Sequence, residues 1–276
     1  MEQIIEGFKR VFKTENALSR HLTLAGIGAI VSLPALFLDK QQFEAAFTAH
    51  NYISIIPQVL IWGVLALIYI CYVMGYMLKF AHNCFDPENK NLMPKFDSEP
   101  FAIFLKALPL KIFWAGYFLL HIALVVAILQ PHWILIIIVY LFMLYGFGPI
   151  ALNYIAFAKD YNTKGLFDIV LPYKYFKLAG NEYWLMVMKF IPFNMAASVL
   201  SSFILVIMSI FVAISGKKED IMALAKLVTY LYTVVNTYCI LVISMVWHYR
   251  AVVLYKEEIE PGPHNKEMEE HYGTDF

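Results

Sequence analysis

The chain has 276 residues, of which 61% are hydrophobic and 15% charged, with 21 basic and 21 acidic side chains and a mean hydropathy of +0.63. Soluble chains are roughly 45–50% apolar and about 25% charged. This composition therefore excludes a soluble domain, a disordered chain and a nucleic-acid-binding module. The three cysteines are odd in number and lie mostly in apolar runs, so we expect no disulfide framework.

Six apolar stretches are long enough to cross the hydrocarbon core of a membrane, which requires about 20 helical residues. They predict an all-α fold with six transmembrane helices, in a single membrane domain over residues 1–255. Pro34 interrupts the first stretch, and the fifth is long enough for its start to run along the interface. The stretches are His21–Leu38, Ile53–Phe80, Leu110–Gln130, His132–Ala158, Trp184–Ser215 and Ile221–Tyr249.

The distribution of Lys and Arg along the chain predicts how these spans are oriented. Of the 21 basic residues, 17 lie in the N-terminal segment, the second and fourth loops and the C-terminal segment. The other 4 lie on the opposite side. By the positive-inside rule, both termini and the two long loops face the cytoplasm. We therefore expect a multi-pass protein of the cytoplasmic (inner) membrane of a prokaryote.

The two long loops resemble each other. The second span ends in Phe80–Asn83 (FAHN) and the fourth in Phe157–Asp160 (FAKD), and a Phe-Asp pair follows each. The aspartates of these pairs, Asp97 and Asp168, suit N-caps of amphipathic helices, and an apolar stripe runs along Ile4–Phe12. The predicted unit is an interfacial helix followed by a membrane hairpin, repeated three times. The alternative is that amphipathic helices commonly precede membrane spans and that the matches are chance.

Several short motifs follow one another from the second span onward: Gly75–Leu78 (GYML), Leu92–Asp97 (LMPKFD) and Phe104–Leu108 (FLKAL). They resemble an uncharacterised multi-pass membrane family of bacteria and archaea, domain-of-unknown-function family 4013. Pro149–Ala151 and Phe167–Asp168 fit the second half of that family's pattern, so the resemblance covers roughly residues 15–255. It implies a fold and a topology, and neither an activity nor site residues.

The common catalytic motifs are absent from the sequence. There is no His-Glu-x-x-His zinc signature, no Gly-x-Ser-x-Gly elbow and no phosphate-binding loop. No acidic residue falls centrally within a predicted span, and no two of the eight histidines have metal-ligand spacing on one helix. We therefore expect no enzyme, no catalytic residue, no metal site and no cofactor.

Polar and flexible residues half-way along the spans form a first candidate site. Pro149 beside Gly146 and Gly148 predicts a kink or break in the fourth span, and broken helices at the midplane are typical of transporter sites. His121 is the ionisable group at that depth, and Asn236 lies half-way along the sixth span. The alternative, which we favour, is packing, because small and polar residues are common where membrane helices meet.

Basic residues form a second candidate site, for the headgroups of anionic lipids. They cap the even-numbered spans or flank the predicted interfacial helices, where each Lys or Arg contributes about 1 kcal/mol of attraction to an anionic membrane surface. The alternative is positive-inside anchoring with snorkelled side chains, and both can hold together. The residues are Lys79, His82, Lys106, Lys159, Lys177 and Arg250.

Residues 256–276 carry seven acidic side chains and two lysines, and Pro261–Pro263 breaks any continuing helix. We expect a disordered cytoplasmic tail that a membrane-protein partner or a second copy of the chain can bind. The leading hypothesis is a lipid-interacting scaffold or assembly subunit, with membrane lipids as partners and no nucleic acid. The alternative is a small-solute or ion transporter or channel with a midplane site near the fourth span.

Overall fold

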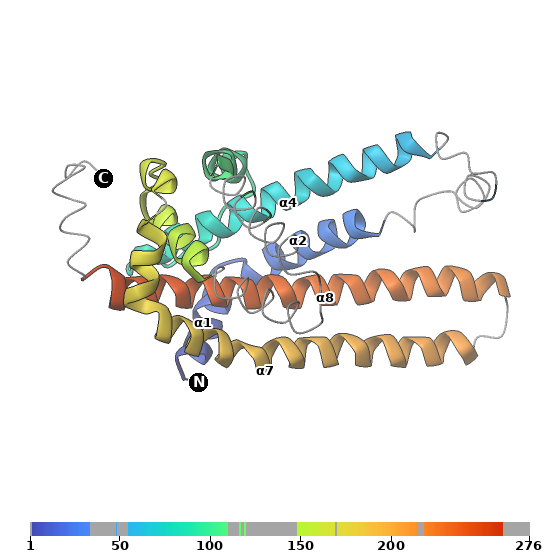
Figure 1. Cartoon of the computed structure of the whole chain (residues 1–276). Helices are drawn as coiled ribbons and strands as arrows, with labels where there is room; N and C mark the ends of the chain where they lie inside the picture. Colours follow the sequence, from blue (N-terminus) through green and yellow to red (C-terminus); the bar gives the residue numbers. More distant parts are fainter. Residues whose placement is uncertain are drawn as a thin grey trace, which may run out of the picture. The chain divides into compact units, whose positions relative to one another are not determined.

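The computed structural model describes residues 2–33, 48, 55–109, 116, 119, 148–168, 170–214 and 218–261. All regular secondary structure within these residues is helical, so the predicted all-α class is confirmed for this part of the chain. Residues 99–109 and 148–160 are helical. The labelled helices are α1 (Glu2–Lys13), α2 (Ala17–Ser32), α4 (Ile56–Phe85), the 3₁₀ turn η3 (Lys164–Phe167), α7 (Leu171–Ile214), α8 (Lys218–Leu254) and the π-helical turn η4 (Tyr255–Ile259) (Figure 1).

Three of the described helices are long and apolar enough to cross a membrane. They cover Ile56–Phe85, Leu171–Ile207 and Lys226–Ile259, whereas α2 is a shorter apolar helix. Only 11%, 12% and 17% of the residues in their most apolar windows are buried. Apolar surfaces of this extent are rare on proteins that are dissolved in water. By length and composition, the chain is therefore a membrane protein.

The second, fifth and sixth predicted spans coincide with α4, α7 and α8. The first span is partly described, by α2, and residues 148–158 of the fourth are helical. The third span lies outside the described residues apart from Gly116 and Leu119. The number of six spans therefore stays a prediction.

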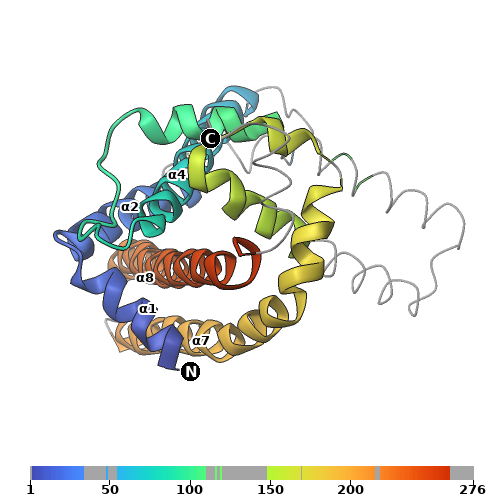
Figure 2. The ribbon, with the colours of Figure 1, turned by 90° about the vertical axis from the view of Figure 1, so that its left-hand side faces the viewer.

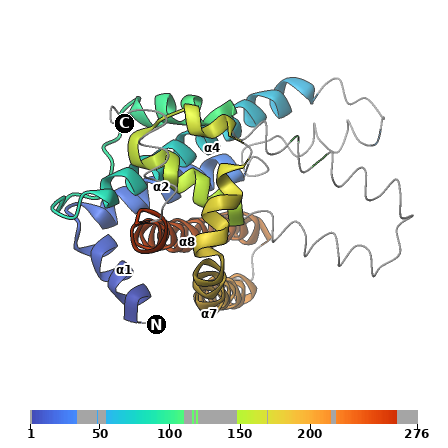
Figure 3. The same ribbon diagram turned by 60° about the vertical axis from the view of Figure 1, so that its left-hand side comes forward.

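The beginning of the fifth span differs from the expected arrangement. We expected an interfacial helix followed by a separate span, but α7 runs unbroken for 44 residues, through Gly180 and Pro192. A glycine costs a helix about 1 kcal/mol relative to alanine, and a membrane helix tolerates proline where neighbouring groups satisfy the freed carbonyl. Neither residue is therefore sufficient to end the helix. In Figure 3 the first turns of α7 (yellow) follow closely on residues 148–168.

The chain divides into two compact units. The first comprises residues 1–9, 74–189 and 245–276, and the second comprises residues 10–73 and 190–244. Helices α1, α4, α7 and α8 contribute residues to both units.

In the first unit, three amphipathic segments pack against three other helices (Figure 2). The segments are α1, residues 99–109 and the first turns of α7, and they contact α8, α4 and helix 148–160, respectively. A glycine makes each contact, because a side chain at that position would overlap the neighbouring segment. The contacts are Gly7 with Val246 and Tyr249, Gly75 with Pro100, and Gly148 with Phe176.

The three amphipathic segments bury side chains at the same helical spacing. In each, the positions i, i+3 and i+7 are buried, and position i+4 is buried or half-buried. One face of each segment is therefore covered by protein, as expected of an amphipathic helix. The positions are Ile4, Gly7, Phe8 and Val11 in α1, Pro100, Ile103, Phe104 and Ala107 in helix 99–109, and Pro172, Tyr175, Phe176 and Ala179 in α7.

Both aspartates accept backbone hydrogen bonds at the start of a helix, but they lie before the N-cap positions, which Ser98 and Val170 occupy. The carboxylate of Asp97 accepts a hydrogen bond from the backbone N–H of Glu99 at 3.0 Å. The carboxylate of Asp168 accepts from the N–H groups of Val170 and Leu171 at 2.8 and 3.2 Å. Each aspartate thus satisfies backbone donors in the first turn of a helix, which otherwise have no partner.

Two glycines of α4 allow a matched test of the first unit. A Cβ at Gly75 would overlap the backbone carbonyl of Pro100, whereas a Cβ at Gly63 would meet no atom within 4 Å. We expect Gly75→Ala to lower the free energy of unfolding by about 1–3 kcal/mol through overpacking. Gly63→Ala should raise it by up to about 1 kcal/mol through helix propensity.

Unfolding of the two purified variants by a denaturing detergent measures both effects. Equal stability of Gly75→Ala and the parent chain would contradict the close approach of α4 and helix 99–109.

Candidate functional site

The predicted midplane residues do not form one described site. His121 and Gly146 lie outside the described residues. Gly148 and Pro149 are buried in the first unit, where Gly148 lies against the ring of Phe176. Asn236 is half-buried and belongs to the second unit.

Asn236 takes part in a polar contact between α7 and α8, which run side by side in Figures 1 and 2. The hydroxyl oxygen of Ser201 lies 2.9 Å from the carbonyl oxygen of Ala197 and 3.4 Å from Oδ1 of Asn236. The side chain of Ser201 is fully buried. Contacts of this kind hold membrane helices together, so the arrangement favours packing over an open polar site at this position.

Four of the six predicted headgroup-binding residues have protein partners in the first unit. Lys79 pairs with Glu99 and lies 4.0 Å from a carboxylate oxygen of Asp97. Arg250, only 9% exposed, donates a hydrogen bond from Nη2 to Oε1 of Gln3 at 2.7 Å. The other two engaged residues, His82 and Lys159, belong to a larger arrangement.

His82, Lys159 and Lys256 join the C-terminal ends of α4, helix 148–160 and α8 in a closed ring, which we call the exit ring. Each end donates to the next end and accepts from the previous one. The three contacts are His82 Nδ1 to the carbonyl oxygen of Ala158 at 2.9 Å, Lys159 Nζ to Oε1 of Glu260 at 2.9 Å, and Lys256 Nζ to the carbonyl oxygen of Phe85.

The chemistry of helix ends explains the exit ring. The last four carbonyl groups of a helix lack intrahelical donors, and this end carries a partial negative charge. Ala158 and Phe85 both lie in the last turn of their helices. Their carbonyl oxygens therefore attract the imidazole and ammonium groups that neighbouring ends supply.

Aromatic rings surround the exit ring. The imidazole of His82 stacks on Tyr161 with centroids 4.7 Å apart. Tyr255 makes edge contacts with Phe85 and Tyr175 at 5.7 and 5.9 Å. Burial also raises the pKa of the Tyr161 phenol, which therefore stays neutral beside His82.

Lys159 stays charged in this setting. Burial lowers the pKa of its ammonium, but the hydrogen bond and negative charge of Glu260 more than compensate, so the pKa is raised above its ordinary value of 10.5. A raised pKa means that the contribution of Lys159 to stability is fully present at neutral pH. It is lost only as the pH rises through the folded-state pKa.

Lys256 and Glu260 were not among the predicted site residues, because a disordered tail was expected from residue 256 onward. Instead, α8 continues as η4, in which the N–H of Glu260 donates to the carbonyl of Tyr255 at 2.9 Å. Ile259 is 1% exposed. No comparable signal was present in the sequence, because the Phe-Ala pair that precedes His82 and Lys159 is replaced by Leu254–Tyr255 before Lys256. Residues 262–276 of the predicted tail lie outside the described residues.

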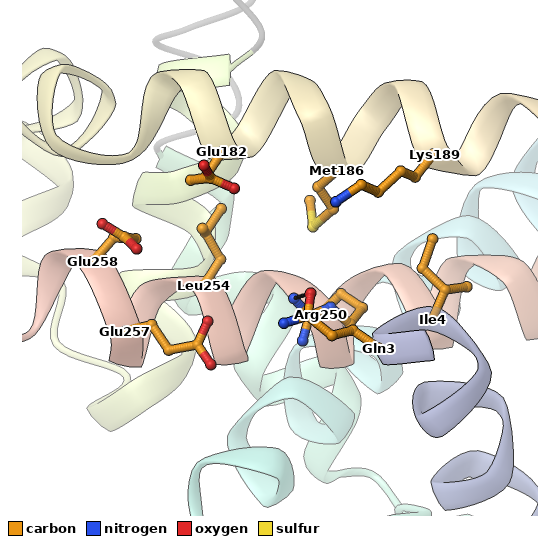
Figure 4. A pocket seen from close by; sticks show the side chains of 9 residues that line it. All are labelled: Gln3, Ile4, Glu182, Met186, Lys189, Arg250, Leu254, Glu257 and Glu258. Atoms are coloured by element: carbon orange, nitrogen blue, oxygen red, sulfur yellow. Dashed lines mark hydrogen bonds between the residues drawn. The ribbon is translucent and has the colours of Figure 1, made fainter. Parts of the chain in front are cut away.

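A small cavity opens between α1, α7 and α8 within the first unit (Figure 4). Its volume is about 60 Å³, and its lining includes two basic residues, Arg250 and Lys189, and three acidic residues, Glu182, Glu257 and Glu258. This volume accommodates a few water molecules, whereas sites for small organic ligands are usually about 300–1,000 Å³. Among the described residues, no three His, Cys, Asp or Glu side chains gather closely enough to hold a metal ion.

The second unit contains a buried histidine that the sequence did not single out. His21, 0% exposed, makes edge contacts with the rings of Phe12 and Tyr238 at 5.9 and 6.0 Å. Within the described part of the chain, neither of its ring nitrogens has a hydrogen-bond partner. The sequence had drawn attention to His121 because of its depth in a predicted span, and His21 lies at the very start of one.

Comparisons with known proteins found no matching family model, no similar curated protein and no similar solved structure. The resemblance of the loop motifs to the uncharacterised multi-pass family therefore stays a prediction.

His21 allows a test of how a buried histidine without a described hydrogen-bond partner affects the free energy of unfolding. A buried donor or acceptor without a partner costs about 1–3 kcal/mol, so we expect His21→Leu to keep or increase the free energy of unfolding. His82→Leu, which removes a hydrogen bond of the exit ring, should decrease it. Detergent unfolding of both variants measures the difference. A loss of stability in His21→Leu as large as that in His82→Leu would show that a partner outside the described residues holds the ring.

Proposed function

We propose that the protein is a non-enzymatic scaffold or assembly subunit of a prokaryotic cytoplasmic membrane, which interacts with lipids and has several membrane spans. The observation that carries the proposal is the first unit. Its three helix ends are joined by the exit ring, and three amphipathic segments pack around them. In this arrangement charged groups hold helices together, and the cavity between α1, α7 and α8 has a volume of only about 60 Å³.

Three observations support a threefold repeat of an interfacial segment and a membrane hairpin. The amphipathic segments share one spacing of buried positions. Each makes a close contact with another helix in which one partner is a glycine. In the exit ring each helix end donates to a neighbouring end, His82 and Lys256 to a backbone carbonyl and Lys159 to a carboxylate. The shared spacing and the cyclic arrangement favour a repeat over a chance similarity of two loops, so we propose six spans in three hairpins.

The proposed orientation places the exit ring and both termini in the cytoplasm. The 17 basic residues on this side include Lys159 and Lys256 of the exit ring. The two lysines have two roles: they contribute to the positive-inside distribution, and they lie where the spans carry the partial negative charge of helix C-terminal ends. The resemblance of the loops to the uncharacterised multi-pass family agrees with this topology.

Labelling of single cysteines tests the orientation. We expect cysteines placed at Asn89 and Thr163 to react only with a reagent on the cytoplasmic side, and one at Ala46 only with a reagent outside. The three native cysteines are first replaced by serine to remove background labelling. Reaction of position 46 from the cytoplasm would overturn the orientation.

The equivalence of the segments is testable at Phe104 and Phe176, which are both 7% exposed. Burying an aromatic side chain contributes roughly 1.5–3 kcal/mol, and a charge in its place adds a further cost. We expect Phe104→Asp and Phe176→Asp to lower the free energy of unfolding by similar amounts, and exposed Leu105→Asp to have little effect. If one Phe variant is silent while the other fails to fold, the segments are not equivalent.

The scaffold proposal is tested against transport in proteoliposomes. We expect the purified protein to conduct neither protons nor small ions, and to retain anionic phospholipids when it is released from nanodiscs into a mass spectrometer. His121→Leu should then change no flux and cost little stability, since an interhelical hydrogen bond contributes about 0.6 kcal/mol in membranes. A measurable flux that His121→Leu abolishes without unfolding the protein would replace the scaffold by a transporter.

A further inference from the structure

A groove on the first turns of α7, which we call the α7 groove, is a candidate binding site in the first unit. It has a volume of about 320 Å³ and is lined by residues from Tyr173 to Trp184. Phe176 and Gly180 lie at its base, where a Cβ at Gly180 would come within 3.3 Å of the Phe176 ring. The absence of a side chain at Gly180 therefore keeps the groove open.

Two polar side chains in the α7 groove have no hydrogen-bond or ion-pair partner among the described residues. Lys177 and Asn181 both line the groove and are exposed. Neither makes a hydrogen bond or ion pair with a described residue, in contrast to the cations of the exit ring. They are four positions apart on one helix, so they lie on the same face. Together they offer an ammonium and an amide donor to one anionic group.

The position of the groove along α7 indicates what kind of anion reaches it. The helix continues from the groove directly into a stretch that is apolar enough to cross a membrane. Tyr173 and Trp184 lie at its two ends, and such aromatic residues are enriched where a span enters the headgroup layer. Leu178, which lines the groove and is 36% exposed, offers an apolar contact. The groove therefore lies at the depth of the lipid headgroup layer.

We propose that the α7 groove binds the phosphate of an anionic phospholipid of the cytoplasmic leaflet, with Lys177 and Asn181 as donors and Tyr173 and Trp184 flanking the glycerol region. The proposal rests on the membrane role proposed above and gives that role one defined lipid site. Lys106 was predicted alongside Lys177 and is also exposed without a described partner, but it does not line this groove. It therefore provides a matched control.

The experiment measures lipid binding by the full chain in nanodiscs of phosphatidylcholine with increasing phosphatidylglycerol, by native mass spectrometry of retained lipid. We expect Lys177→Gln to weaken retention of phosphatidylglycerol about fivefold, the value of one basic residue near an anionic surface. Lys177→Arg should bind like the parent chain, and Lys106→Gln should change retention less than twofold. Gly180→Leu, which fills the groove without changing charge, should also lose the lipid.

Equal losses in Lys177→Gln and Lys106→Gln would show general charge attraction and would overturn the site, as would no loss in either. Displacement of the lipid by millimolar inorganic phosphate would overturn the assignment to a lipid. The proteoliposome assay tests the scaffold proposal independently of the α7 groove. A flux with preserved lipid retention would contradict the scaffold and would leave the α7 groove as a lipid site.

Discussion

The open carbonyl groups at the ends of the long helices are the constraint on which the first unit depends. A long apolar helix leaves four unpaired carbonyl groups and a partial negative charge at its C-terminal end. The exit ring meets this demand with groups from neighbouring ends, since His82 donates to Ala158 and Lys256 donates to Phe85. The third contact, between Lys159 and Glu260, requires α8 to continue through η4. The π-helical turn is thus explained by the ring that it completes.

Close glycine contacts bring the amphipathic segments against the helices that the exit ring joins. A side chain at each of these glycines would overlap the neighbouring segment. Gly75 and Gly148 permit this approach on the long helices, and Gly7 permits it on the segment itself. The location of the glycine differs, yet the spacing of the buried positions is the same in all three segments. The packing geometry is therefore more regular than the sequence that produces it.

Local sequence patterns predicted the helices that they determine and missed contacts between distant residues. Hydropathy placed α4, α7 and α8, and the aspartates at 97 and 168 marked helix starts, because both signals act within a few residues. The continuity of α7 was not predicted. Gly180 and the nearby polar residues suggested a break, but their effect on the helix is too weak to end it. The exit ring was missed for a different reason. Lys256 lies 171 positions from Phe85, and no periodicity encodes such a pair.

The predicted headgroup-binding cations of the first unit fall into two groups, which the sequence alone did not distinguish. Those at the helix ends, such as Lys159 and Arg250, have protein partners and are partly or mostly removed from solvent. Those on the amphipathic segments, Lys106 and Lys177, are exposed without described partners. A cation that already satisfies a carbonyl or carboxylate gains little from a phosphate, because it must first give up its partner. We therefore propose that lipid recognition belongs to the segments, while the helix ends hold the fold together.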